Sequence, residues 1–157
     1  MTIPTSGRIL GVDWGEVRIG LALSDETQTL ARPLETLQRR KGKRFPMPRF
    51  LELTAEHRPV GLVVGLPLSG EGYEEVSAIA ARDMATTLSG RTGLPLELWD
   101  ERMTTARALA AIQEQGGSTR GRKGDVDALA AAVLLQQFLN ARKNRSLRAE
   151  ITERSEL

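Results

Sequence analysis

The hydrophobic positions of this chain form short runs separated by glycine, proline and polar residues. Some runs are continuously apolar, such as residues 61–66, which is typical of a strand covered on both faces. Others repeat their apolar residues at helical spacing. The order of the runs predicts an α/β protein with a hairpin at its start and two parallel crossovers. We expect strands at 8–13, 18–24, 32–37, 61–66 and 95–100, and helices at 48–57, 74–89, 104–115 and 126–141.

Two of the expected helices have distinctive faces. The helix at 74–89 includes Ile79, Met84 and Leu88 among its apolar positions. In the last helix, Asp127 falls on the same helical line as Ala131, Leu134 and Phe138. This line should face the sheet, so a charged residue is expected on an inward stripe.

The length of 157 residues is enough for one domain with its own core. We expect that domain to span residues 1–141 and to be followed by a charged tail, residues 142–157, that frays or is disordered. The longest mostly apolar stretch, 128–139, is too short to span a bilayer. The beginning of the chain has no pattern of a secretion signal. These features predict a cytoplasmic protein that is not bound to a membrane.

The composition limits the kinds of metal site that the chain can form. There is no cysteine, which excludes disulfides and thiolate zinc sites. The only histidine, His57, is expected at a helix end, where a surface position is the usual explanation. Any metal must therefore be held by oxygen ligands, which favours Mg²⁺ or Mn²⁺.

Carboxylates occur where buried strands should end. Asp13 follows an apolar run and is flanked by Gly11 and Gly15, which permit a sharp turn and the close approach of a phosphate. Glu101 follows the expected strand at 95–100, and the carboxyl ends of strands are where ligands gather in open α/β sheets. Asp127 or Asp125 at the start of the last helix completes a possible set. Such a set suits Mg²⁺ and phosphodiester chemistry.

Each carboxylate also has a structural explanation. Asp13 can fix a turn, Asp125 or Asp127 can cap the helix, and Asp100 with Glu101 can pair with Arg102 at the surface. Their joint occurrence at two strand ends and one helix start favours a site. Whether Asp100 or Asp125 also binds metal is left open by the sequence.

Basic residues are concentrated in two segments although the net charge is only +2. The segment 39–49 contains six basic residues and no acidic residue, with Arg39, Arg40 and Lys41 at its start. The second segment ends at Lys123, which we expect to contact phosphate oxygens. Basic segments beside a set of carboxylates favour nucleic acid as the partner. Solvated loops are the alternative.

At this point the residues match a known pattern. The chain resembles the YqgF/RuvX family of Holliday junction resolvases, which are also described as pre-16S rRNA nucleases. The resemblance extends from Arg8 to Leu139. It rests on Gly11-Val12-Asp13-Trp14-Gly15 with Arg18 and Gly20, on Ser24-Asp25, on Val64-Gly65-Leu66-Pro67-Leu68 with Gly72, on Asp100-Glu101-Arg102 with Thr104-Thr105, and on Asp127 with Ala130-Ala131.

The resemblance implies an RNase H-like fold, with a central mixed five-stranded sheet of three antiparallel strands then two parallel ones, flanked by helices. It implies metal-dependent cleavage of nucleic acid by Asp13, Glu101 and Asp127. Arg18 and Arg102 match positions that orient carboxylates or contact phosphate. Trp14 and the long basic segment are less usual in the family.

Several functions remain open at this stage. The favoured one is a Mg²⁺-dependent nuclease that acts on structured RNA, in processing the 5′ end of pre-16S rRNA. A Holliday junction resolvase, which acts on four-way DNA, uses the same chemistry. A sugar-kinase-like or actin-like ATP-binding module would need a second half that the chain lacks, and a non-catalytic nucleic-acid-binding protein would not need all three acids. The sequence does not indicate whether the protein is a monomer or a dimer.

Overall fold

The computed structural model describes residues 2–15, 17–39, 45–66, 76–100 and 123–155. Its centre is a five-stranded sheet in the order β3-β2-β1-β4-β5. The first three strands are antiparallel to their chain neighbours, whereas β4 pairs parallel with β1 and β5 pairs parallel with β4. This is the mixed sheet expected from the sequence. The strands are β1 (Ile9–Asp13), β2 (Arg18–Ser24), β3 (Ala31–Gln38), β4 (Gly61–Leu66) and β5 (Leu96–Asp100).

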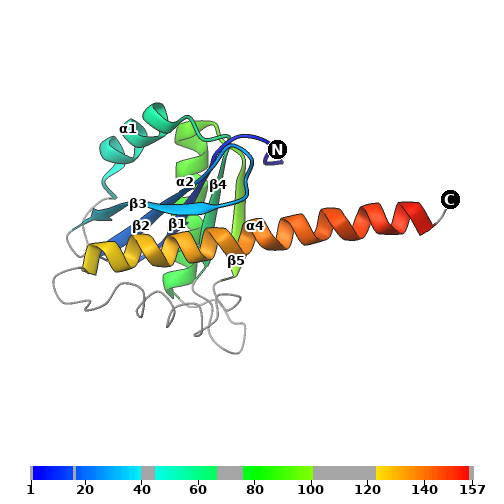
Figure 1. Cartoon of the computed structure of the whole chain (residues 1–157). Helices are drawn as coiled ribbons and strands as arrows, with labels where there is room; N and C mark the ends of the chain where they lie inside the picture. Colours follow the sequence, from blue (N-terminus) through cyan, green and yellow to red (C-terminus); the bar gives the residue numbers. More distant parts are fainter. Residues whose placement is uncertain (1, 16, 40–44, 67–75, 101–122, 156–157) are drawn as a thin grey trace.

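Helices cover both faces of the sheet (Figure 1). On one face lie α1 (Met47–His57) and α2 (Val76–Thr92). On the other face α4 (Lys123–Ser155) packs against β1, β2 and β3. The helix expected at 104–115 lies outside the described residues.

The alternation of side chains along each strand divides the core into two layers. Leu10 and Val12 of β1 belong to the layer beneath α1 and α2, together with Phe50 of α1. Ile9 of β1 belongs to the layer beneath α4, together with Phe138. A residue's position in its strand therefore decides which helix layer it faces.

Helix α2 contacts the sheet through small side chains rather than through Ile79. Ala78, Ala81 and Ala85 are fully buried, as is Leu88, whereas Ile79 is 51% exposed. Ile79 is apolar in sequence but lies on the outer side of the helix. The alanine stripe allows the helix to lie close to β4 and β5.

The charged tail differs from the expected frayed segment, because α4 continues without a break to Ser155. Figure 1 shows this part of α4 projecting beyond the sheet toward the C-terminus. Residues 142–155 include no glycine or proline and are rich in good helix formers, which favours helix even in the absence of packing. The base of the projection is held to the body because Arg142 donates hydrogen bonds to the carbonyls of Ile3 and Pro4.

Gly20 provides a test of how closely α4 must approach the sheet. A Cβ at this position would overlap the carbonyl oxygen of Asp127. We expect Gly20→Ala to lower the free energy of unfolding by about 1–3 kcal/mol, since the first turns of α4 must move outward. Chemical denaturation measures this effect.

The matched control is Gly90→Ala, because Gly90 lies in α2 and a Cβ added there would meet nothing within 4 Å. That substitution should raise stability by roughly 0.5–1 kcal/mol through helix propensity. Equal stability of the Gly20 variant and the parent would contradict the close approach.

Candidate active site

The carboxyl end of β1 is the centre of the candidate site. Asp13 is the last residue of β1 and is half-buried. It pairs with Gly20 on β2 and with Gly65 on β4. By strand alternation Asp13 shares a face with Ile9, which belongs to the layer under α4. Asp13 is therefore directed to the side of the sheet that carries α4.

Asp127 reaches the same place from α4. The backbone of Asp127 packs directly on Gly20, the antiparallel partner of Asp13. Gly20 thus brings together two segments that each carry a carboxylate and are far apart along the chain. That the two carboxylates share one site stays a prediction from the strand end and the helix start.

Arg18 holds the carboxylate of Asp127. Its Nε donates a hydrogen bond of 2.7 Å to Oδ2 of Asp127, and the two side chains are 37% and 30% exposed. Arg18 begins β2, so it lies at the same edge of the sheet as the end of β1. The pair orients Asp127 while leaving it in reach of solvent.

The helix-cap explanation for Asp127 does not hold. The helix begins at Lys123, so Asp127 lies in its second turn rather than at its N-cap. The line of residues that continues from it is buried as expected: Ala131, Leu134 and Phe138 are at most 2% exposed. The side chain of Asp127 is thus a charged group at the end of an inward apolar stripe, bound to Arg18.

The glycines around Asp13 have specific roles. A Cβ on Gly15 would overlap the carbonyl oxygen of Arg18, so the turn after β1 excludes any side chain there. A Cβ on Gly11 would lie 3.0 Å from Cβ of Leu135. Gly11 therefore accommodates α4, which is a different role from the approach of a phosphate.

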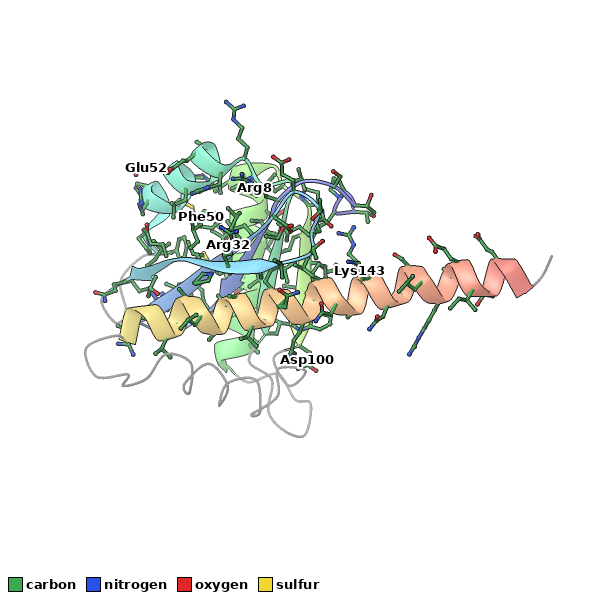
Figure 2. All side chains as sticks on the ribbon, in the orientation of Figure 1. Arg8, Arg32, Phe50, Glu52, Asp100 and Lys143 are labelled. Carbon is green, nitrogen blue, oxygen red and sulfur yellow. The ribbon has the colours of Figure 1, made fainter. Side chains whose placement is uncertain are left out.

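The third expected acid, Glu101, lies outside the described residues, as does Arg102. Its neighbour Asp100 ends β5, and Figure 2 shows Asp100 at the opposite end of the sheet from Arg8. Leu96 and Leu98 belong to the layer under α1 and α2, so alternation places Asp100 on that face, away from Asp13 and Asp127. The side chain of Asp125 is not among those described.

The oxygen donors present fit the expected metal. Asp13 and Asp127 supply hard carboxylate oxygens at one edge, which suits Mg²⁺ or Mn²⁺. Among the residues that the structure describes, no group of three acidic or histidine side chains forms a metal site. The chain as described thus provides two of the three expected ligands.

The expected phosphate contacts divide into three groups. Arg39 is described, and its guanidinium lies 4.5 Å from the centroid of the Trp14 ring. Arg40 and Lys41 lie outside the described residues. Lys123 is the first residue of α4, and its side chain is not described. Contacts of these residues with nucleic acid remain predictions.

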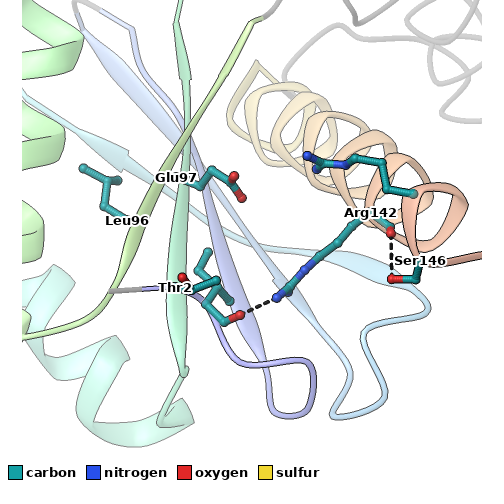
Figure 3. Close-up of a pocket in the computed structure, with 7 residues that line it drawn as sticks. Thr2, Leu96, Glu97, Arg142 and Ser146 are labelled. Atoms are coloured by element: carbon teal, nitrogen blue, oxygen red, sulfur yellow. Dashed lines mark hydrogen bonds between the residues drawn. The ribbon is translucent and has the colours of Figure 1, made fainter. Parts of the chain in front are cut away.

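Two hollows elsewhere on the molecule are separate from this edge. One of about 350 Å³ lies between the N-terminal segment, the start of β5 and α4, and is lined by Glu97 and Arg142 (Figure 3). Another of about 520 Å³ is lined by Arg8, Arg32 and His57. Neither is lined by Asp13 or Asp127, so the candidate site is an open edge rather than part of either hollow.

Comparison with known proteins identifies the family of this chain. Residues 7–141 match the family described as RuvX: Holliday junction resolvase. The chain belongs to the RuvX family. The resemblance inferred from the motifs is therefore confirmed, and the chain is a member of a nuclease family.

Two relatives that align with most of this chain have the same name. A protein of Anaeromyxobacter dehalogenans (strain 2CP-C) is 43% identical over 135 residues, which are 86% of this chain and 98% of that protein. A protein of Klebsiella pneumoniae (strain 342) is 38% identical over 134 residues, which are 85% and 96% of the two chains. Both are named pre-16S rRNA nucleases.

Solved structures confirm the RNase H-like fold of this RuvX family member. RuvC of Thermus thermophilus matches with a TM-score of 0.56 at 20% identity, covering 87% of this chain and 96% of that one. The same protein in complex with a Holliday junction substrate matches with a TM-score of 0.55.

Within the described residues, no helix is both long and apolar enough to cross a membrane.

Arg49 can be separated experimentally from the rest of the basic segment 39–49. It pairs with Glu35 at 2.7 Å and with Glu52 at 3.0 Å. The hydrogen bond from Arg49 holds the pKa of the Glu35 carboxyl below its usual range. The pair therefore stabilises the fold above the unfolded-state pKa of Glu35, and this contribution is lost as the pH falls through the lowered pKa.

We expect Arg49→Gln to lower the melting temperature at neutral pH, and the difference from the parent to shrink as acid protonates Glu35. Thermal melts across the acid range check this. Arg32→Gln is the control, because it removes the same charge from an exposed position. A difference for Arg49→Gln that is constant with pH would exclude the ion pair as its cause.

Proposed function

We propose that the chain is a metal-dependent nuclease that hydrolyses phosphodiester bonds in structured RNA, with the 5′ end of pre-16S rRNA as its substrate. The observation that carries the proposal is the convergence of Asp13 and Asp127 at one edge of the sheet, across Gly20. The names of the relatives support RNA as the substrate. Processing of such a precursor would place the protein in the cytoplasm.

The ligand set in this proposal is Asp13, Glu101 and Asp127, with Mg²⁺ or Mn²⁺ as the metal. Glu101 is included because it directly follows Asp100, the residue that ends β5. A bound ion at such a set activates a water molecule and stabilises the charge that develops on the phosphate. The carboxylates repel one another until the ion binds, so metal uptake should increase stability.

Arg18 has a defined part in this proposal. Its hydrogen bond fixes the direction of the Asp127 carboxylate, so that one oxygen is occupied and the group cannot rotate freely. An ion pair that is about one-third exposed contributes little to stability. The function of the ion pair in this proposal is to orient the Asp127 carboxylate toward the metal.

The second candidate function is a Holliday junction resolvase. The description of the family favours it, and the chemistry at the carboxylates is the same. Phosphate contacts carry no sequence information, so the basic residues suit either polymer. A resolvase that cuts two symmetric strands requires a dimer, whereas a single cut in RNA does not.

Asp13→Asn tests the catalytic assignment. It keeps the shape of the side chain and removes the charge that would hold the metal. We expect cleavage to fall by at least about 10²-fold, while binding of nucleic acid in EDTA changes little. Turnover equal to that of the parent would remove Asp13 from the mechanism. Glu97→Gln, on the same sheet but in the hollow of Figure 3, is the matched control and should leave cleavage unchanged.

A comparison of substrates tests the metal requirement and the choice between RNA and four-way DNA. The intact protein is incubated with a labelled rRNA precursor and with a four-way DNA junction, each with Mg²⁺, Mn²⁺ or EDTA. We expect cleavage of the precursor in the presence of either metal and none in EDTA. Preferential cleavage of the junction would favour the resolvase, and cleavage of neither would favour a binding protein. Light scattering after size exclusion measures the oligomeric state. A resolvase requires a dimer, whereas a nuclease that makes a single cut in RNA does not.

A further inference from the structure

An aromatic cluster lies on the other face of the sheet, directly after Asp13. The ring of Trp14 stacks on Phe45 with a centroid distance of 6.1 Å and an interplanar angle of 20°. Phe45 in turn contacts Phe50 of α1 edge-on at 5.6 Å. Trp14 and Phe45 are 9% and 7% exposed, and Phe50 is fully buried. The cluster is therefore a rigid part of the core, and Trp14 is its outermost ring.

Arg39 is held at two points, of which one is Trp14 of this cluster. Its guanidinium carbon lies 4.5 Å from the centroid of Trp14. Its backbone N–H donates a hydrogen bond of 2.8 Å to the carbonyl of Val17, which continues the β2–β3 pairing one step beyond Arg18 and Gln38. The position of Arg39 is thus fixed at the same end of the sheet as Arg18 and Asp13.

Trp14 contacts the residues on both sides of the most basic part of the chain. Arg39 precedes residues 40–44 and Phe45 follows them, and both pack on the one indole ring. The intervening sequence carries four basic residues: Arg40, Lys41, Lys43 and Arg44. A single side chain adjacent to Asp13 therefore anchors both flanks of this basic stretch.

The contact with Trp14 restrains the guanidinium group of Arg39, whose central carbon lies over the indole ring. A guanidinium presents several N–H donors in one plane, and this fork suits bidentate contact with phosphate. The contact also reduces the conformational freedom that Arg39 would lose on binding.

We propose that Trp14 is a positioning residue that holds Arg39 against a backbone phosphate of the nucleic acid, next to the carboxylates at the end of β1. The proposal rests on the proposed function, because it assigns a nucleic-acid contact to the same edge. Trp14 thereby couples the acidic residue that precedes it in sequence to the basic segment that follows β3. Arg39 binds the polymer on the α1 face of the sheet, while Asp13 and Asp127 act on the α4 face.

A double-mutant cycle tests this coupling. The variants are Trp14→Leu, Arg39→Gln and the double variant, and binding of a structured RNA hairpin is measured in EDTA over a series of salt concentrations. Arg39→Gln should lower the slope of log affinity against log salt by roughly 0.7–0.9, the value for one phosphate contact. Trp14→Leu should weaken binding about 2–5-fold through the lost cation–π contact. The double variant should bind as Arg39→Gln does.

Two matched variants control for charge and for folding. Arg32→Gln removes one positive charge at the other end of β3, where Arg32 pairs with Leu23, and should leave the salt slope unchanged. Trp14→Phe keeps an aromatic face for Arg39 and should bind within about twofold of the parent. It also keeps the experiment informative if Trp14→Leu fails to fold. In that case the cycle is run with Trp14→Phe, whose weaker cation–π face should make the effect of Arg39→Gln smaller than in the parent, and an equal effect would overturn the proposal.

Additive effects of Trp14→Leu and Arg39→Gln would overturn the proposal, as would a salt slope that Arg39→Gln does not change. Because binding is measured without metal, the result is independent of cleavage. If the two substitutions are coupled but the parent cleaves nothing, the nuclease function is refuted and the contact between Arg39 and phosphate is supported. If the parent cleaves RNA but the two effects are additive, the nuclease function is supported and the role of Trp14 is refuted. In an active enzyme, Trp14→Leu should raise KM and leave kcat unchanged, since it removes uniform binding.

Discussion

The close packing of α4 on β2 at Gly20 is the contact on which the candidate site depends. Asp13 lies on a strand and Asp127 on a helix, and neither position implies the other. They meet because Gly20 is the pairing partner of Asp13 and has no side chain to keep the backbone of Asp127 away. Between Ala128 and Leu139 the helix is held there by buried residues, including Leu135 and Phe138. The energy that brings the acids together thus comes from apolar burial, which offsets the cost of placing two carboxylates near each other.

The strands were the part of the fold that could be predicted best from the sequence. Runs such as Gly61–Leu66 are buried on both faces, so every residue is apolar or glycine and the run is plain to see. The buried faces of the helices were harder to predict, because the outer face of a helix can carry either polar or apolar residues. Ile79 is apolar yet half exposed, and the residues that pack α2 on the sheet are mostly alanines. The charged end of α4 is helical although it buries little, because it extends a helix already held on the sheet and contains no residue that breaks it.

The site was predictable to the extent that it follows from strand ends. Asp13 ends a buried strand, and its position at the edge follows from topology alone. The hydrogen bond between Arg18 and Asp127 depends on the register of β1 with β2 and on the rotation of α4, which the sequence does not specify. The role of Trp14 was also hidden, because its contacts with Arg39 and Phe45 join segments that are distant in sequence. An aromatic residue directly after Asp13 was the only signal in the sequence.

The sheet separates the two kinds of charge at this edge, and that separation has a physical consequence. If Arg39 lay on the α4 face, its guanidinium would compete with a metal ion for the carboxylates of Asp13 and Asp127. Strand alternation instead places Trp14, and with it Arg39, on the face opposite to Asp13. Arg18 does reach Asp127, and its Nε donates one hydrogen bond to a single oxygen of that carboxylate. In the proposed function, the acids are thereby kept for a divalent ion and Arg39 for the polymer, with the sheet between them.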